Sequence, residues 1–248
     1  MKQFVIDSAS VCDEKAVIRG KDFHYLVHVR RCRVGSQFLV VDETGRRYEA
    51  SVTVISPDEC VLTLTAVESV PTEEKPAAEL ILIQCLPKAK KMDLIVRQAV
   101  EAAVCRVVPA VSRYCISRPD ARAAVEKVRR WQLIAREAIQ QSGSAVGTTV
   151  DGIASLETVA DKFSDCDCRL FFHHLPLPNQ VRLHDAVPGA KRIVFVIGPE
   201  GGLDDGETEM LSQKGFRSVY LGRNILRCET APLYAAAAVN IILEECQQ

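Results

Sequence analysis

The sequence predicts a small β-barrel followed by an α/β domain with a parallel sheet. Short β-branched segments separated by turn signals fill residues 1–70, and this pattern is typical of small barrels. From residue 78 onward, apolar strands alternate with amphipathic helices, which indicates a parallel sheet covered on both faces. Residues 71–77 contain two prolines among charged side chains, a composition typical of a linker. We therefore expect a barrel domain at 1–70 and an α/β domain at 78–248.

The N-terminal domain is expected to hold three strands and a short helix. Apolar and polar residues partly alternate, as in half-buried strands, at 37–41, 48–55 and 61–67. Residues 42–45 (Asp-Glu-Thr-Gly) predict a hairpin turn between the first two strands. Residues 22–31 predict the helix.

The C-terminal domain is expected to alternate strands with helices. Short apolar runs predict strands at 80–86, 106–111, 169–173, 193–197 and 218–221. Longer amphipathic segments predict helices at 92–104, 119–141, 204–215 and 230–245. Asp204 and Glu207 have the spacing of a capping box, and Pro232 falls in a first helical turn, where proline is favoured.

Composition favours a protein that acts in the cytoplasm. Hydrophobic residues make up 48% of the chain and charged residues 25%, a balance usual for globular proteins. The longest apolar run, 235–243, is interrupted by Asn240 and is too short to span a bilayer. The first residues contain no apolar core of a secretory signal. We expect no membrane partner.

The ten cysteines are interpreted as reduced, buried thiols, because nothing directs the chain to an oxidising compartment. One group resembles a metal site and comprises Cys166, Cys168, His173 and His174. Its Cys-x-Cys spacing differs from that of a zinc knuckle, so we expect no metal.

The charges are segregated along the chain although they nearly cancel. Lys and Arg number 31 and Asp and Glu 32, which gives a net charge of −1. Basic residues gather at 15–47, 88–91 and 113–130, and acidic ones at 68–79 and 157–167. This distribution is compatible with a basic face that binds nucleic acid, and equally with ordinary solvated helix faces.

Two glycine-bearing loops carry most of the functional signal. The first is IGPEGG at 197–202, and the second is LGRNILRCETA at 221–231. Each follows an expected strand and leads into an expected helix. Glycine lets a ligand approach the bare backbone, and neighbouring loops at the carboxyl edge of a parallel sheet could form one pocket. The first loop has neither the dinucleotide nor the phosphate-loop spacing. Alone, it is equally compatible with a plain strand-to-helix connection.

The second loop combines apolar and charged residues. Ile225 and Leu226 could form a wall for an adenine ring, and Arg227 could face an anionic or electron-rich partner. The same residues also fit a helix N-terminus, with Thr230 as the cap and Glu229 beside the helix dipole. The two interpretations are compatible with each other.

Together these motifs resemble those of the knotted RNA methyltransferases of the SPOUT class. More narrowly, they resemble the family that methylates N3 of uracil in 16S ribosomal RNA. Four further segments are similar to motifs of that family, so the resemblance covers nearly the whole chain; they are 24–35, 86–93, 101–104 and 141–143.

The resemblance implies a PUA-like barrel followed by a trefoil-knotted α/β domain. It implies S-adenosylmethionine as cofactor, 16S rRNA or the small ribosomal subunit as partner, and a homodimer whose pockets are completed across the interface. The loop after His173 would form a third wall of the pocket. The cofactor-binding residues would be Gly198, Glu200, Gly201, Gly202, Leu221, Ile225 and Leu226.

The reaction that the resemblance implies gives a hypothesis for two residues, because N3 of uracil must lose a proton, which leaves charge on the adjoining oxygens. We expect Arg227 to stabilise charge on the uracil oxygens and Glu200 to orient the pocket or act as a base. Arg30 and Arg31 of the barrel, with Lys88 of a lysine-rich turn, are expected to contact RNA.

The chain departs from the family pattern at several positions. Gln140 and Ser144 replace charged residues, Asn224 replaces an arginine, Cys228 a threonine and Ala103 a glycine. Arg223 could supply the charge missing at 224. These departures leave two alternatives open: a related methyltransferase with another RNA target, such as a ribose 2′-hydroxyl, and a non-catalytic RNA-binding ribosome-assembly protein with a decayed site.

Overall fold

The computed structural model describes residues 4–7, 10–42, 46–67, 77–142, 144, 146–178 and 180–246. The chain divides into two compact units. The first contains Met1–Glu74 and Ile139–Gly147, and the second contains Lys75–Ala138 and Thr148–Gln248. Except for Ala77, the predicted linker lies outside the described residues, as do positions 43–45 of the predicted hairpin turn.

The first unit contains a six-stranded sheet in the order β1-β4-β5-β6-β3-β2. Its pairings are antiparallel except for β1 with β4. The three predicted strands are confirmed as β4, β5 and β6. The full set of strands is β1 (Phe4–Ile6), β2 (Val11–Cys12), β3 (Lys15–Arg19), β4 (Gln37–Asp42), β5 (Arg47–Ile55) and β6 (Glu59–Ala66).

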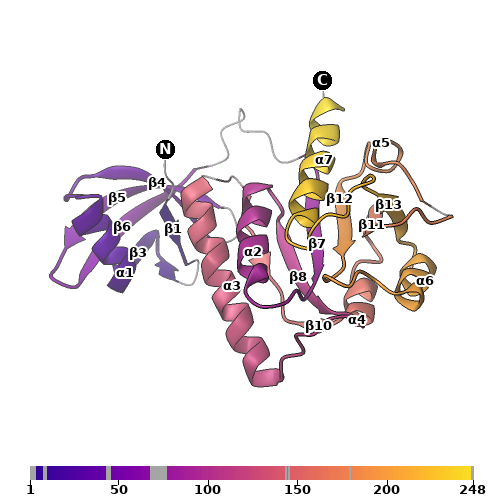
Figure 1. The fold of residues 1–248 in the computed structure, drawn as a ribbon. Helices are drawn as coiled ribbons and strands as arrows, with labels where there is room; N and C mark the ends of the chain where they lie inside the picture. The colour runs from indigo at the N-terminus through magenta and orange to yellow at the C-terminus, as the bar shows by residue number, and fades with distance from the viewer. Residues whose placement is uncertain are drawn as a thin grey trace. The chain divides into compact units, whose positions relative to one another are not determined.

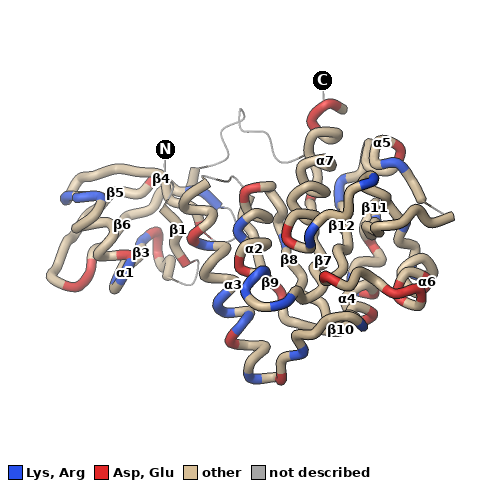
Figure 2. Tube along the Cα trace, in the orientation of Figure 1, with Lys and Arg blue, Asp and Glu red and all other residues tan. Residues whose placement is uncertain are grey.

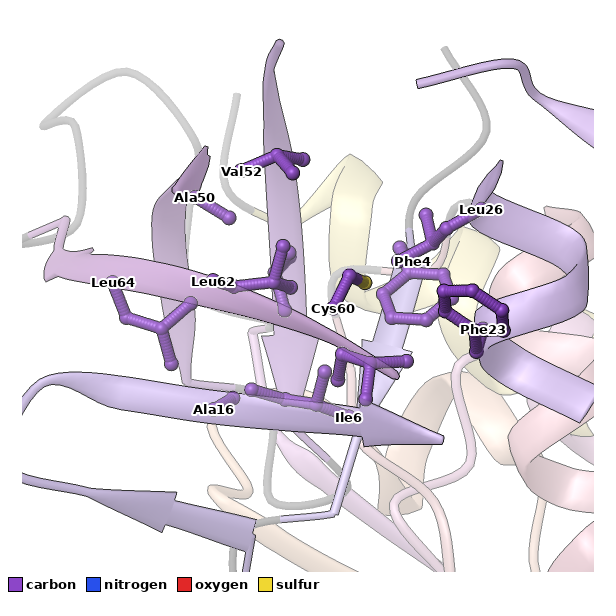
Figure 3. Packing of buried hydrophobic residues seen from close by; sticks show 12 residues of the cluster. Phe4, Ile6, Ala16, Phe23, Leu26, Ala50, Val52, Cys60, Leu62 and Leu64 are labelled. Atoms are coloured by element: carbon purple, nitrogen blue, oxygen red, sulfur yellow. The ribbon is translucent and has the colours of Figure 1, made fainter. Parts of the chain in front are cut away.

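The predicted helix at 22–31 is confirmed in position, but it consists of two consecutive helical segments that together cover 20–29. α1 covers Gly20–His24, and the π-helical segment η2 covers Tyr25–Val29. This region packs Phe23 and Leu26 into the core of the sheet, where they lie with Phe4, Cys60 and the alternate inward residues of the strands (Figure 3).

The second unit contains a seven-stranded sheet in the order β10-β8-β7-β12-β11-β13, with β9 beside β8. Every pairing among its described strands is parallel, as predicted. The central strands are almost fully buried, which requires cover on both faces. The strands are β7 (Glu79–Cys85), β8 (Arg106–Val111), β9 (Thr149–Val150), β10 (Ala154–Ser155), β11 (Cys168–His173), β12 (Arg192–Ile197) and β13 (Arg217–Tyr220).

Six helices of the described chain accompany this sheet (Figure 1): α2 (Lys91–Glu101), α3 (Ala121–Ser142), α4 (Leu156–Asp161), α5 (Leu183–Ala186), α6 (Asp205–Gln213) and α7 (Ala231–Glu245). α7 packs against α2, α5 and β7, whereas α4 packs against β8 and α6. None of the helices in the described part of the chain is both long and apolar enough to cross a bilayer. The trefoil knot stays a prediction.

Helix ends show which local signals were interpreted correctly. The capping box of α6 is confirmed, because Glu207 N–H donates to Asp204 (2.7 Å) and Asp204 N–H donates to Glu207 (3.1 Å). Proline occupies the first turn of α7 as predicted. Thr230 is the N-cap residue of α7, as predicted, but its side chain makes no capping hydrogen bond.

The segregated charges are partly neutralised in the structure. Blue and red segments alternate along α3 in Figure 2. Arg130 pairs with Asp93, Arg122 with Glu126, and Arg113 with Asp204 at 2.8 Å. These pairs favour the interpretation of the 113–130 group as a solvated face.

The cysteines are all free thiols, as expected. The expectation that they are buried was wrong for Cys12 and Cys246, which are exposed. Cys168 begins β11 and Cys166 lies two residues before it, whereas His173 ends the strand and His174 follows it. Among the described residues, no three metal-ligating side chains gather at one point.

Replacing Ala103 by glycine is expected to stabilise the protein by about 1 kcal/mol. Ala103 follows α2 with a φ of +54°, a left-handed conformation that costs an L-residue about 1–2 kcal/mol. The amides of Ala103 and Val104 donate to Val100 and Ala99, the pattern of a helix end that favours glycine. Urea unfolding would measure the gain. Ala102→Gly is the control, because Ala102 has a φ of −91° and nothing to relieve; equal stabilisation by both changes would contradict the explanation.

Candidate active site

A cavity of about 550 Å³ opens where the two glycine-bearing loops meet. Because β11, β12 and β13 are parallel neighbours, the loops that follow them lie at the same edge of the sheet. The volume falls within the range of about 300–1,000 Å³ usual for small-molecule sites. The loops after β11, β12 and β13 and the start of α2 supply its lining: Lys91, Phe172–His174, Ile197–Leu203, Leu221, Gly222, Asn224–Glu229 and Ala231.

The first glycine loop is folded tightly on itself. Gly202 N–H donates to the Pro199 carbonyl at 2.9 Å. A Cβ on Gly198 would lie 2.9 Å from the Gly202 carbonyl carbon, and one on Gly201 would lie 2.9 Å from the Cβ of Tyr114. Gly202 has a φ of +73°, which disfavours any L side chain. The loop therefore requires glycine at these three positions, and its bare backbone lines the cavity.

The second loop gives the cavity an apolar wall and a free cation. Leu221, Ile225 and Leu226 all line it, and Ile225 is 79% exposed. The carbonyl of Arg227 accepts hydrogen bonds from the Thr230 and Ala231 amides, both at 2.9 Å, which fixes its backbone. The Arg227 side chain is exposed and forms no ion pair with any described residue. It is therefore available to a ligand.

Lys91, at the start of α2, joins the two loops. Its ammonium lies 3.0 Å from the Glu200 carboxylate and 3.1 Å from the Glu229 carboxylate. The Lys88 amide also donates to both oxygens of Glu200, at 3.1 and 3.2 Å. The side chains of Lys91, Glu200 and Glu229, together with the thiol of Cys228, are called the loop clamp below. The clamp connects the first loop, the second loop and α2.

Ion pairing sets the protonation of the clamp. The hydrogen bonds to Glu200 and Glu229 raise the pKa of Lys91. Burial acts to raise the pKa of Glu200 and of Glu229, but hydrogen bonds from backbone amides and from Lys91 outweigh it, so both pKa values are lowered. Burial, together with the hydrogen bond to Glu229, raises the pKa of the Cys228 thiol to about 12. At neutral pH the clamp holds one cation, two carboxylates and a neutral thiol.

The structure brings the expected pocket residues together. Gly198, Glu200, Gly201, Gly202, Leu221, Ile225, Leu226 and Arg227 all line the one cavity, and His173 and His174 form its third wall. We had not expected Lys91 or Glu229 to meet there, since residues 88–91 looked like a plain basic turn and Glu229 like a helix-dipole partner. Only the pairing of the loops in space reveals the clamp.

The expected RNA-binding residues lie outside the cavity lining. The Arg30 guanidinium sits 5.1 Å from the centre of the Phe38 ring. Arg31 is exposed with a φ of +55°, and the Lys88 side chain is exposed.

Two of the residues that differ from the family pattern, Asn224 and Ser144, have defined surroundings in the structure. Asn224 lines the cavity whereas Arg223 does not, so the proposal that Arg223 replaces the missing charge in the pocket is not supported. The Ser144 hydroxyl donates to the Val146 carbonyl at 3.1 Å and is used locally.

Comparison with known proteins places this fold and cavity in a class. Residues 73–240 match the family model described as "RNA methyltransferase domain", and residues 18–65 match "RNA methyltransferase PUA domain". The protein is thus an RNA methyltransferase with a PUA-like N-terminal domain. More specifically, the chain belongs to the ribosomal RNA small subunit methyltransferase E family, which confirms the family that its motifs resemble.

Relatives of this family match along most of their length. The ribosomal RNA small subunit methyltransferase E of Aquifex aeolicus is 30% identical, over 82% of this chain and 84% of the relative. That of Bacillus subtilis is 26% identical, over 90% and 88%. The crystal structure of the Neisseria gonorrhoeae enzyme, bound to S-adenosyl methionine, is 27% identical with a TM-score of 0.81, over 97% of each chain.

Proposed function

We propose that this protein transfers the methyl group of S-adenosylmethionine to N3 of a uridine in 16S rRNA. The observation that carries the proposal is the cavity in which the two glycine loops meet, within a chain of the methyltransferase E family. The relatives are named as small-subunit rRNA methyltransferases, which supports rRNA as the substrate. A cytoplasmic site of action is part of the same proposal.

The residues of the cavity fit the cofactor. Gly198, Gly201 and Gly202 expose backbone amides and carbonyls that can read an adenine or a ribose, and Leu221, Ile225 and Leu226 offer apolar surface to the adenine ring. Glu200 orients the first loop through Lys88 and Lys91. When bound, the cofactor supplies an electrophilic methyl group, whose transfer depends mainly on placement.

The acceptor atom dictates what the other residues must do. N3 of uracil carries a proton and lies on the Watson–Crick edge, so the target base must be unpaired or turned out of its stack. Loss of that proton puts negative charge on the uracil oxygens. We assign Arg227 to stabilise this charge, because it is exposed in the cavity and has no ion-pair partner among the described residues. The lowered pKa of Glu200 favours an orienting role over that of a base.

RNA binding and dimerisation complete the proposal. Arg30, Arg31 and Lys88 are assigned to contacts with RNA phosphates. Tyr234 and Ile241 on α7 are 51% and 55% exposed, and such apolar residues on one helix support a homodimer.

Mass spectrometry of rRNA tests this function directly. In a strain lacking the gene, one N3-methyluridine of 16S rRNA should disappear, and this chain should restore it. Loss of a ribose 2′-O-methyl group instead would identify the alternative RNA target. Calorimetry with S-adenosylmethionine should give binding near one molecule per protomer; absence of binding to the folded protein would favour the non-catalytic alternative.

A further inference from the structure

Methyl transfer to N3 requires a group that takes the N3 proton, and the cavity holds a small set of candidates. The inference below rests on the proposed function. The titratable side chains lining the cavity are contributed by α2, by the loop after β11 and by the two glycine-bearing loops. They are Lys91, His173, His174, Glu200, Arg227, Cys228 and Glu229.

Five of these groups are unsuited to accept a proton at neutral pH. Glu200 and Glu229 are held by the Lys91 ammonium at 3.0 and 3.1 Å, which stabilises their ionised form and makes them weak bases. Lys91 and Arg227 already carry their protons. The Cys228 thiol lies 3.3 Å from the Glu229 carboxylate, to which it donates, and it stays protonated there.

The two histidines remain, and their geometry distinguishes them. Nδ1 of His173 lies 3.1 Å from the Leu175 carbonyl oxygen and 3.3 Å from the Leu175 amide nitrogen, so this nitrogen is occupied by its own turn. His174 is exposed and hydrogen-bonds to no described residue. Its Nδ1 would lie 3.7 Å from a Cβ built on Gly202, which places the imidazole against the first glycine loop. The centres of the two imidazole rings are 4.5 Å apart, so the His173 ring packs against the His174 ring.

We propose that His174 is the catalytic residue that accepts the N3 proton of the target uridine. The unprotonated ring nitrogen of His174 takes the proton, and the electron pair left on N3 forms the new bond to the methyl carbon. The carbon–sulfur bond breaks with its electrons going to sulfur, which leaves neutral S-adenosylhomocysteine. The imidazolium then returns its proton to solvent. Imidazole is the side chain whose ordinary pKa lies nearest to neutrality, as this exchange requires.

The test is single-turnover methylation of small ribosomal subunits that lack the modification, followed from pH 5 to 9. In the wild type, the rate should fall as the pH decreases, because a general base that already carries a proton cannot accept another. His174→Gln should lower the rate at neutral pH by about 100-fold or more and remove that fall at low pH. Binding of S-adenosylmethionine, measured by calorimetry, should change less than threefold. Added imidazole should partly restore the rate of His174→Gly.

Two further variants keep the assignment falsifiable. His184→Gln changes an exposed histidine of α5 that does not line the cavity, and it should behave as the wild type. A His174→Gln enzyme that keeps both its rate and its pH profile would overturn the inference. The inference would also be overturned if His173→Gln, and not His174→Gln, removed the fall of the rate at low pH. If the wild-type protein itself leaves N3 unmethylated, the proposed function is wrong. Failure of the proposed function can therefore be distinguished from failure of the role assigned to His174.

Discussion

Replacing Arg227 by alanine is expected to slow single-turnover methylation by about 100- to 1,000-fold, the range seen when one group that stabilises developing charge is removed. Arg227 lines the cavity, its backbone is fixed by two amides, and its guanidinium has no carboxylate partner among the described residues. A guanidinium in that situation lacks a structural use but can face the uracil oxygens as they gain charge. The rate should be measured with saturating cofactor and rRNA, so that binding defects do not enter.

The same loop supplies the control. Arg223→Ala removes an exposed arginine that does not line the cavity, and its single-turnover rate should stay within about threefold of the wild type. Arg227→Lys keeps the charge but loses the planar fork, and should recover only part of the rate. If Arg227→Ala methylates as fast as the wild type, Arg227 has no part in the chemistry.

The loop residues could be predicted from the sequence because each motif is contiguous. Three glycines close together after an apolar run indicate a backbone-lined turn, and Gly198, Gly201 and Gly202 occupy such a turn. Parallel strands then require the turns to share an edge of the sheet. The strands β7, β8, β11 and β12 were predictable for a similar reason, since strands buried on both faces form continuous apolar runs.

Other features depend on the folded chain and give no local signal. β9 and β10 are only two residues long and exist through their pairing with β8. The helical segment after β3 changes to a π-helix at Tyr25, and Leu26 of this turn is buried in the core. Lys91, Glu200 and Glu229 are separated by up to 138 positions in the sequence, so no spacing rule could have joined them.

Lys91→Met is expected to slow methylation by about 10- to 100-fold and to weaken the binding of S-adenosylmethionine. Lys91 holds the two loops together through Glu200 and Glu229, and its removal leaves these carboxylates facing each other without a cation. Repulsion should separate the loops, and a displacement of about 1 Å near reacting groups can cost about 100-fold in rate. Calorimetry and single-turnover kinetics would measure the two effects. Lys90→Met, which changes the exposed preceding residue, is the control.

The pH dependence of cofactor binding separates this electrostatic role from simple packing. In the wild type, the lowered pKa values of Glu200 and Glu229 keep the clamp ionised above their unfolded pKa, and its contribution is lost only as the pH falls through the lower folded values. In Lys91→Met, repulsion between the carboxylates should raise the pKa of one of them, so that protonation stabilises the folded site and binding improves from pH 7 to pH 5. Glu229→Gln added to Lys91→Met should recover part of the affinity at pH 7, and Lys91→Arg should recover more. A Lys91→Met protein whose affinity, like that of the wild type, does not improve from pH 7 to pH 5, and which Glu229→Gln leaves unimproved, would show that Lys91 acts by packing alone.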